Sequence, residues 1–404
     1  MVSRMKVVFA TLGGDAWTGG LTYQHNLLEA LGQYAPQVEV YLLARPDRES
    51  AVGDERYTVI QYPPSGYGLV GRLCTEALRQ LTGYDLMLHQ ALRTIPNGGP
   101  DVIFPAEFSS GRRTALLFWI PDFQHVRLPE MFTATDIRAR DTKFKQGIRR
   151  ATLVVLSSQD ARKDFCDFAP QHEHKSRVMH FVACPPTQVY DTDPKTMIIR
   201  YNLPERFFYL PNQFWKHKNH TLVLEALKIS GEEGIRPFVV CTGNPSDFRH
   251  PTYFAELMQR ISLWGLRDQI AYLGLVPHEH VYLLIRQSIC VLNPSLFEGW
   301  STIVEEVKSI GKYILLSDLA VHREQDPPAA TYFDPYNAVD LASKLARIWA
   351  DLPSGPDVQL ERNTRSELPT RMQNYARSFV SIAREAVEIA RGQTRPPAAP
   401  DTPA

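Results

Sequence analysis

Residues 289–316 of the chain read ICVLNPSLFEGWSTIVEEVKSIGKYILL. Two short apolar runs, 289–293 and 313–316, are typical of buried β-strands, and a polar turn and a helix are expected between them. Ser301 or Thr302 is suited to cap that helix, and Glu305 would complete a capping box with Thr302. A strand, a turn, a helix and a second strand form the repeating unit of a parallel sheet with crossover helices.

The same alternation continues through the chain in two series. In the first series, strands are expected at 6–12, 38–44, 101–104, 115–120, 153–156 and 178–182. Prolines and short polar residues then interrupt the pattern at Cys184-Pro185-Pro186 and at 190–194, where a linker is expected. In the second series, strands are expected at 207–210, 237–241, 270–274, 289–293, 313–316 and 331–333.

Two α/β domains are therefore expected, in keeping with a length of 404 residues. The predicted boundaries are 1–190 for the first Rossmann-like domain and 191–368 for the second. A helix over 369–391 follows, and the tail 392–404, rich in proline and alanine, is expected to be disordered. Each domain is expected to be a doubly wound parallel sheet, with a cleft between the two domains.

The composition argues for a small-molecule partner. The 44 basic and 44 acidic residues balance, so there is no electrostatic case for nucleic acid. Five cysteines are scattered singly, as expected for buried thiols in a reducing cytoplasm. The first residues resemble a strand that runs into a glycine turn, and no apolar stretch reaches about 18 residues, so neither a signal peptide nor a membrane span is expected.

The turn and helix of the opening segment also carry candidate chemistry. Glu298 and Glu306 are separated by seven residues, and the first amides of a capped helix attract anions. From the residues alone, the segment predicts an anion site flanked by two carboxylates. The alternative interpretation is a surface turn with a capped helix and solvated acids.

On this Glu, seven residues, Glu pattern, the chain resembles glycosyltransferase family 4, whose members are retaining enzymes of the GT-B fold. Residues 278–318, together with Phe333-Asp334-Pro335, are similar to the donor-binding region of that family. The resemblance implies that Glu306 accepts hydrogen bonds from ribose hydroxyls and that Glu298 holds hydroxyls of the donor sugar. It also implies diphosphate contacts from the amides of Ser301 and Thr302, no metal ion and no other cofactor.

A second block, residues 210–220, follows the first strand of the second series. Lysines suit the neutralisation of a departing diphosphate, and Lys218 matches the phosphate lysine of the family. Gln213 stands where the family has an arginine, so Lys216 is expected to supply the missing charge. Both Gln213 and Lys216 are counted among the donor-binding candidates, and a solvated loop is the alternative.

The first domain contributes two further segments. The loop 12–20 is rich in glycine, and the resemblance places Gly19 and Gly20 near the donor phosphates or sugar. Segment 119–132 is similar to a family stretch in which a histidine precedes Asp122, but Pro121 occupies that position here. Asp122 or His125 is expected to take over its catalytic work, and a buried structural side chain is the alternative.

The turn 273–277 is expected to lay Leu275 and Val276 along the base of the nucleotide, ahead of a helix that begins near His278. Backbone contacts do not separate uracil from guanine, so a UDP-sugar is the first choice and a GDP-sugar the second. The resemblance further implies that the first domain binds the acceptor and that the last helix crosses back to it. An acceptor glycan, a lipid-linked sugar and a small molecule all stay open.

Three further patterns in the sequence have simpler interpretations. His278-Glu279-His280 and His172-Glu173-His174 lack a third ligand for zinc. The basic stretch 138–150 suits a solvated helix face, with peripheral contact to the inner face of a membrane as the alternative. The rival functions are a catalytically inactive sugar-nucleotide-binding protein and a GT-B epimerase or phosphorylase.

Overall fold

The computed structural model describes residues 4–12, 18–44, 56–63, 69–96, 98–111 and 113–392. The chain divides into two compact units of similar size. The first comprises Met1–Phe123, Ala134–Phe181 and Thr370–Ala404, and the second comprises Gln124–Thr133 and Val182–Pro369. The glycines and other residues at 13–17 and the tail 393–404 lie outside the described residues.

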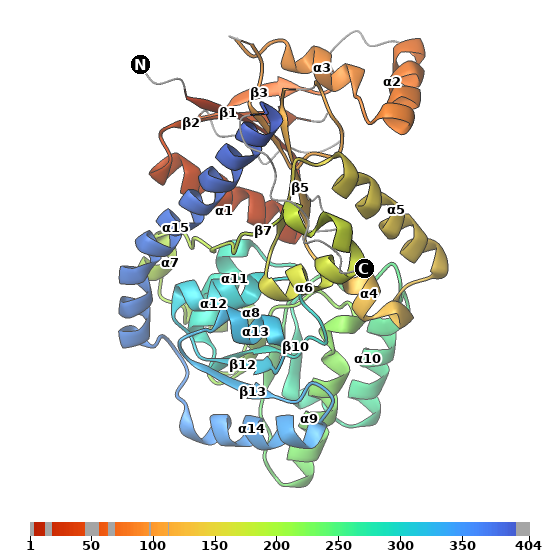
Figure 1. Ribbon diagram of the computed structural model, residues 1–404. Coiled ribbons are helices and arrows are strands. Elements are labelled where there is room, and N and C mark those ends of the chain that lie inside the picture. The colour runs from red at the N-terminus through yellow and green to blue at the C-terminus, as the bar shows by residue number, and fades with distance from the viewer. Residues whose placement is uncertain are drawn as a thin grey trace, which may run out of the picture. The chain divides into compact units, whose positions relative to one another are not determined.

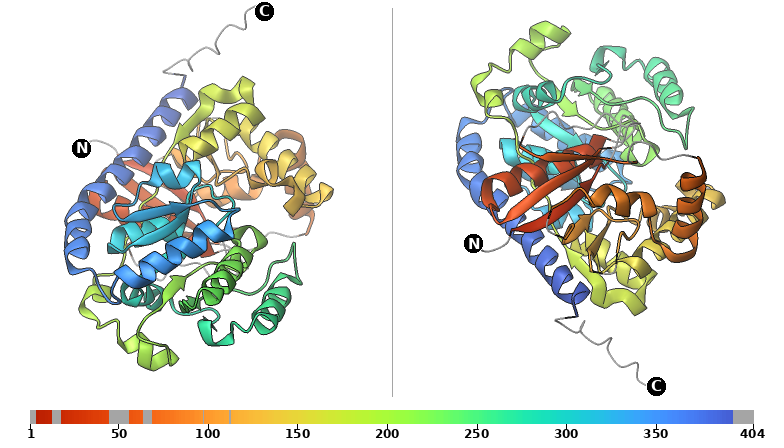
Figure 2. Two further views of the ribbon diagram at one scale, coloured as in Figure 1. Left: turned by 90° about the horizontal axis from the view of Figure 1, so that it is seen from below. Right: turned by 90° about the horizontal axis from the view of Figure 1, so that it is seen from above.

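The first unit holds a seven-stranded parallel sheet with the strand order β3-β2-β1-β4-β5-β6-β7. The strands are β1 (Met5–Ala10), β2 (Val38–Ala44), β3 (Thr58–Gln61), β4 (Val102–Phe104), β5 (Ala115–Ile120), β6 (Leu153–Leu156) and β7 (Ser176–Val178). The helices of this unit include α1 (Thr18–Tyr34), α2 (Leu69–Thr82), α3 (Leu86–Leu92), α5 (Ala134–Arg150) and α6 (Gln159–Phe168). In the view from above, β1 and β2 lie side by side in red (Figure 2).

The central strands of this sheet are apolar because both of their faces are covered. All six residues of β5 are buried. On one face, Tyr23 of α1 stacks on Trp119, with ring centroids 4.3 Å apart. The last helix, α15 (Val358–Ala390), packs here too, and Phe379 stacks on Phe9 of β1 at 5.5 Å. The part of α15 from residue 370 onward belongs to this unit.

The second unit holds a six-stranded parallel sheet with the order β10-β9-β8-β11-β12-β13. The strands are β8 (Phe208–Leu210), β9 (Val239–Cys241), β10 (Ile270–Tyr272), β11 (Cys290–Asn293), β12 (Ile314–Ser317) and β13 (Ala330–Phe333). The helices include α4 (Gln124–Arg127), α7 (Gln188–Asp191), α8 (Thr196–Tyr201), α9 (His220–Glu232), α10 (Tyr253–Leu263), α11 (His278–Gln287), α12 (Thr302–Ile310), α13 (Ala320–Gln325) and α14 (Ala338–Asp351).

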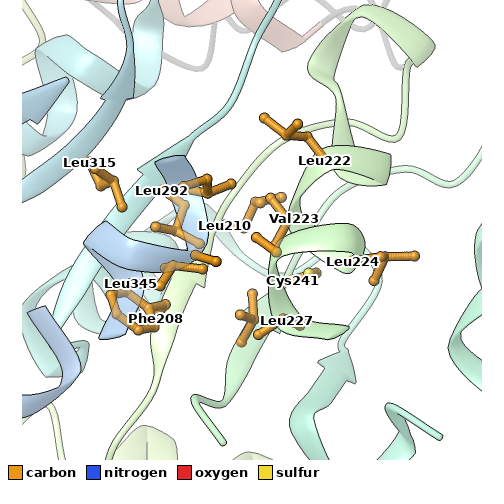
Figure 3. Packing of buried hydrophobic residues seen from close by; sticks show 14 of the residues in the cluster. Phe208, Leu210, Leu222, Val223, Leu224, Leu227, Cys241, Leu292, Leu315 and Leu345 are labelled. Atoms are coloured by element: carbon orange, nitrogen blue, oxygen red, sulfur yellow. The ribbon is translucent and has the colours of Figure 1, made fainter. Parts of the chain in front are cut away.

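Two apolar clusters sandwich the second sheet, because successive residues of a strand point to opposite faces. Phe208 and Leu210 pack with α9, α10 and α14, whereas Tyr209 packs with α11 and α12. Figure 1 shows α9 and α14 together below the sheet. Figure 3 shows side chains of the first cluster, with Leu292 and Leu345 drawn near Phe208 and Leu210. The sheet is therefore doubly wound, as the sequence predicted.

The expected strands are confirmed, with shifts at their ends and two larger differences. The edge strand β3 was not predicted, because only one of its four residues is buried and its apolar signal is weak. The strand expected at 178–182 pairs at Ser176–Val178 instead, and the apolar residues that follow are buried without joining the sheet. The expected linker, 184–194, contains the short helix α7, and α8 follows directly after it.

The last helix also differs from its prediction. It begins at Val358 and continues through Pro369, whereas the sequence placed its start near residue 369. Its first half is largely polar and exposed, so apolar spacing could not reveal it. In the described part of the chain, no helix is both long and apolar enough to cross a membrane.

Candidate functional site

The second sheet has a point at which the winding of the chain reverses. From β8 the chain proceeds outward to β9 and β10, and it then returns to β11 on the other side of β8. Ligands of open parallel sheets bind outside the carboxyl ends of the strands at such a point. The loops that follow β8 and β11 carry Lys218 and Glu298.

Lys218 and Glu298 form an ion pair at this edge of the sheet. Lys218 Nζ donates to Glu298 Oε1 at 2.6 Å, and the two side chains are 13% and 10% exposed. Burial alone would raise the pKa of Glu298, but Lys218, His322 and the Ser295 hydroxyl outweigh it, so the pKa lies below its ordinary value. Glu298 is therefore ionised at neutral pH and is balanced by a nearly buried cation.

Buried side chains hold the turn between β11 and α12 in place. Asn293 Nδ2 donates to Ser301 Oγ at 2.9 Å. Ser295 Oγ lies 2.7 Å from both Asn293 Oδ1 and Glu298 Oε1, so its single proton serves one of them at a time. The turn therefore presents Glu298 from a fixed backbone.

The predicted capping box is wrong. Ser301 is the N-cap residue of α12, but its side chain accepts from Asn293 and caps no amide of the helix. Gln325 of α13 replaces the box: its Oε1 accepts from the Ser301 N–H at 3.1 Å, and its Nε2 donates to Glu305 Oε1 at 3.2 Å. A glutamine twenty residues away in the sequence gives no local capping signal.

This arrangement changes how the predicted anion site works. The first N–H groups of a helix lack carbonyl partners and attract negative charge. A phosphate oxygen would reach the Ser301 N–H only by displacing Gln325, whereas nothing in the described part of the chain accepts from the Thr302 N–H. Diphosphate contacts from these two amides stay a prediction, with Thr302 the more accessible of the two.

Glu306, the second carboxylate, lies one turn into α12 and is 3% exposed. His278, the first residue of α11, places its Nε2 2.6 Å from Glu306 Oε1. Burial would lower the pKa of His278, but the Glu306 carboxylate outweighs it and holds that pKa above its ordinary value. The sequence identified Glu306 but missed His278 as its partner.

The loops around these residues approach one another closely. The Gly243 N–H donates to Gly274 O at 2.9 Å, and a Cβ at Gly243 would overlap the carbonyl oxygen of Asn212. This contact ties the turn before α11 to the loop after β9. In that turn Leu275 is 62% exposed and Val276 is half-buried. Their expected contact with a nucleotide base stays a prediction.

The two other candidates in the loop after β8 have different surroundings. Gln213 Oε1 accepts from the Asn244 N–H at 2.8 Å, so its amide helps hold the neighbouring loop. The Lys216 N–H donates to Asp247 Oδ2 at 3.0 Å, and Lys216 is exposed. Lys218 is thus the more enclosed of the two lysines, and the roles of Gln213 and Lys216 toward a donor stay predictions.

His322 of α13 was not predicted to take part. It has no exposed surface, its Nδ1 lies 2.8 Å from Ser317 O, and its Nε2 has no hydrogen-bond partner in the described residues. Burial lowers its pKa, although the Glu298 charge acts against this. The ring is therefore neutral. Polar residues that follow each strand of a parallel sheet are the signal that would have revealed both His322 and Gln325.

Segment 124–133 groups with the second unit and contains His125. His125 is 1% exposed, and its ring centroid lies 6.4 Å from that of Phe132. Arg249, in the loop after β9, donates to Gln124 Oε1 at 3.0 Å, and its guanidinium carbon lies 4.7 Å from the Phe132 ring centroid. His125 is thus an enclosed side chain, and its catalytic role stays a prediction.

The remaining candidates lie in the first unit. Gly19 and Gly20 belong to the first turn of α1, which follows β1. Asp122 follows β5 and pairs with Arg140 of α5 at 3.3 Å. Their expected roles toward the donor and the acceptor stay predictions. In the described residues, no group of three or more histidine, cysteine, aspartate or glutamate side chains is arranged to hold a metal ion.

Comparison with known proteins indicates the class of protein and its fold. Residues 198–378, most of the second unit, match the family described as "Glycosyl transferases group 1". A search of curated proteins finds no significant sequence match. The family match covers the Lys218, Glu298 and Glu306 positions and indicates a glycosyltransferase.

Solved structures agree on the fold over almost the whole chain. Anabaena HepE in complex with UDP and glucose is 17% identical, with a TM-score of 0.63 and coverage of 96% of this chain and 100% of that one. Sucrose-phosphate synthase from Thermosynechococcus elongatus is 15% identical, with a TM-score of 0.62 and coverages of 96% and 99%. A UDP-forming trehalose-phosphate synthase from Burkholderia xenovorans is 13% identical, with a TM-score of 0.63 and coverages of 95% and 99%. The chain has the GT-B fold.

Proposed function

We propose that this protein is a retaining glycosyltransferase of family 4. It transfers a sugar, most simply a hexose, from a nucleotide diphosphate sugar to an acceptor hydroxyl. The observation that carries the proposal is the Lys218–Glu298 pair at the point where the winding of the second sheet reverses. A cation and a carboxylate held 2.6 Å apart there suit a ligand that is both a diphosphate and a polyol.

In the proposed mechanism, the diphosphate takes the place of Glu298 beside Lys218. Lys218 then offsets the charge that grows on the diphosphate as the bond to the sugar breaks. The displaced Glu298 accepts hydrogen bonds from donor-sugar hydroxyls, and Glu306 accepts them from the ribose. The departing phosphate itself removes the proton of the acceptor hydroxyl on the front face, so neither a metal ion nor a separate protein base is needed.

UDP is the preferred nucleotide, and GDP is the second choice. Support comes from similar structures, because HepE was solved with UDP-glucose, and the trehalose-phosphate synthase is UDP-forming. Both proteins are less than 25% identical to this chain, so a binding experiment has to decide the donor.

The acceptor is assigned to the first unit, where Asp122 is the candidate contact. The proposed location is the cytoplasm, and the alternative is peripheral contact with the inner face of the membrane.

The test is a thermal-shift screen of the full chain against UDP, GDP and their sugars. A ligand that binds only the folded state at a hundred times its dissociation constant adds about 2.7 kcal/mol of stability. We expect one nucleotide family to raise the melting temperature. If no nucleotide or nucleotide sugar does so, the proposal is wrong.

A catalytically inactive nucleotide-sugar binder is the second candidate. It is favoured by Gln213, which occupies the position of the family arginine and has its amide oxygen bonded to the Asn244 N–H. Hydrolysis of the bound donor without acceptor separates the two candidates. A transferase releases free sugar slowly, whereas an inactive binder stabilised by the same donor releases none.

A further inference from the structure

The two carboxylate oxygens of Glu306 differ in their hydrogen bonding. Its Oε1 lies 2.6 Å from His278 Nε2, whereas its Oε2 has no hydrogen-bond partner in the described part of the chain. The carboxylate is 3% exposed, but the His278 side chain is 51% exposed. One oxygen is thus held from the rim of the site, and the other is left to accept a hydrogen bond.

His278 is anchored so that it can hold this position. It is the first residue of α11, directly after the turn that is tied to the β9 loop through Gly274. One turn further along the helix, the buried Tyr282 packs against it, with ring centroids 4.8 Å apart. A ring fixed by both its backbone and its neighbour restricts the rotamers of the carboxylate that it contacts.

The histidine two residues later provides a matched control. His280 lies on the same helix, but its Nδ1 contacts the hydroxyl of Tyr201 at 2.7 Å, away from Glu306. The two histidines therefore lie on the same helix, and each has a polar partner of its own. Only His278 contacts a residue of the proposed donor site.

We propose that His278 is a positioning residue of the nucleotide site. It fixes Glu306 through Oε1 so that Oε2 accepts a hydrogen bond from a ribose hydroxyl. His278 thereby sets the preference of the site for a ribose that carries its 2′- and 3′-hydroxyls. This inference rests on the proposed function, because it requires a nucleotide ligand.

The experiment compares two ligands by calorimetric titration: the nucleoside diphosphate that binds the wild type, UDP or GDP, and its 2′,3′-dideoxy form. His278→Phe keeps a ring but removes the donor, and it should weaken binding of the ribonucleotide about tenfold, on the scale of one hydrogen bond to a charged group. Binding of the dideoxy form should be nearly unchanged. His278→Gln retains an N–H donor and should restore most of the difference, and His280→Phe should match the wild type with both ligands.

The outcomes separate the inference from the proposed function. If the wild type binds neither UDP nor GDP, the proposed function is wrong, and the inference, which requires a nucleotide ligand, is wrong as well. If the wild type binds but His278→Phe weakens both ligands equally, the histidine has only a structural role and the inference is wrong. Tighter binding of the ribonucleotide to His278→Phe would also overturn it, because His278 would then compete with the ribose.

Discussion

The turn after β11 and the helix α12 that follows it each hold one carboxylate of the proposed donor site, but the two carboxylates have different partners. In the turn, Glu298 is paired with the full charge of Lys218, and both side chains are nearly buried. On the helix, Glu306 is held by His278, whose ring is half exposed and whose pKa the carboxylate holds above its ordinary value. A nearly buried pair of full charges suits a carboxylate next to the part of the ligand whose charge changes during the reaction. A weaker pair at the rim suits a part of the ligand that does not change during the reaction.

Removing the cation that pairs with the carboxylate of the turn should have the largest effect. Lys218→Ala should lower turnover about a hundredfold or more, the scale of one preorganised electrostatic group, roughly 3 to 4 kcal/mol. Steady-state turnover with the donor found by the screen is the measurement. Lys216→Ala is the matched control, because Lys216 lies two residues away in the same loop and is exposed. A larger loss in the control than in Lys218→Ala would transfer the phosphate role to Lys216.

Removing the carboxylate of the turn should slow the reaction and spare nucleotide binding. Glu298→Gln keeps the size of the side chain and removes the charge that orients the sugar as its anomeric carbon becomes positive. Turnover should fall by about tenfold or more, since this contact is felt mainly in the transition state. Affinity for the free nucleoside diphosphate should not fall, because Glu298 gives up its place beside Lys218 to the diphosphate. Turnover equal to that of the wild type would remove Glu298 from the chemistry.

Removing the carboxylate of the helix should have the opposite pattern. Glu306→Ala should weaken binding of the free nucleoside diphosphate by roughly tenfold, about 1.5 kcal/mol for hydrogen bonds to a charged group. Turnover at saturating donor should fall much less than in Glu298→Gln. Calorimetry and kinetics on both variants check this contrast, and equal losses of nucleotide affinity in the two would show that the assigned roles are wrong.

The smallest expected effect is on stability. The two carboxylate pairs should lose their contributions to the free energy of unfolding in opposite directions of pH. The pKa of His278 is raised in the fold, so its pair with Glu306 is fully present below the ordinary histidine value and is lost as pH rises through the raised pKa. The pKa of Glu298 is lowered, so its pair with Lys218 is lost only as pH falls through that depressed value.

The melting temperature of His278→Phe should therefore lie below that of the wild type at about pH 6 and approach it at about pH 9. Solvent screens the exposed ring, so the gap should not exceed about 2 to 4 °C. Differential scanning calorimetry of wild type, His278→Phe and His280→Phe measures it. A gap that widens with pH would mean that the sign assigned to the pair is wrong.

The sequence by itself determined the doubly wound sheets, because apolar runs of strand length mark buried parallel strands and polar residues directly after them mark the carboxyl edge. It also singled out Lys218, Glu298 and Glu306 as candidates, on the Glu, seven residues, Glu pattern and the family resemblance. The same reasoning was wrong about the capping box, where it relied on helix spacing alone. It also missed β3 and the first half of α15, whose residues are too polar or exposed to show periodicity.

Only the tertiary structure decided which groups share the site. Gln325 reaches the Ser301 N–H from the next crossover, His278 reaches Glu306 across 28 positions, and Lys218 reaches Glu298 across 80. No spacing rule links such residues, because the order of strands in the sheet brings their loops together. That order also sets whether a carboxylate is balanced by a buried lysine or by a histidine at the rim, and hence its charge and freedom when a ligand arrives.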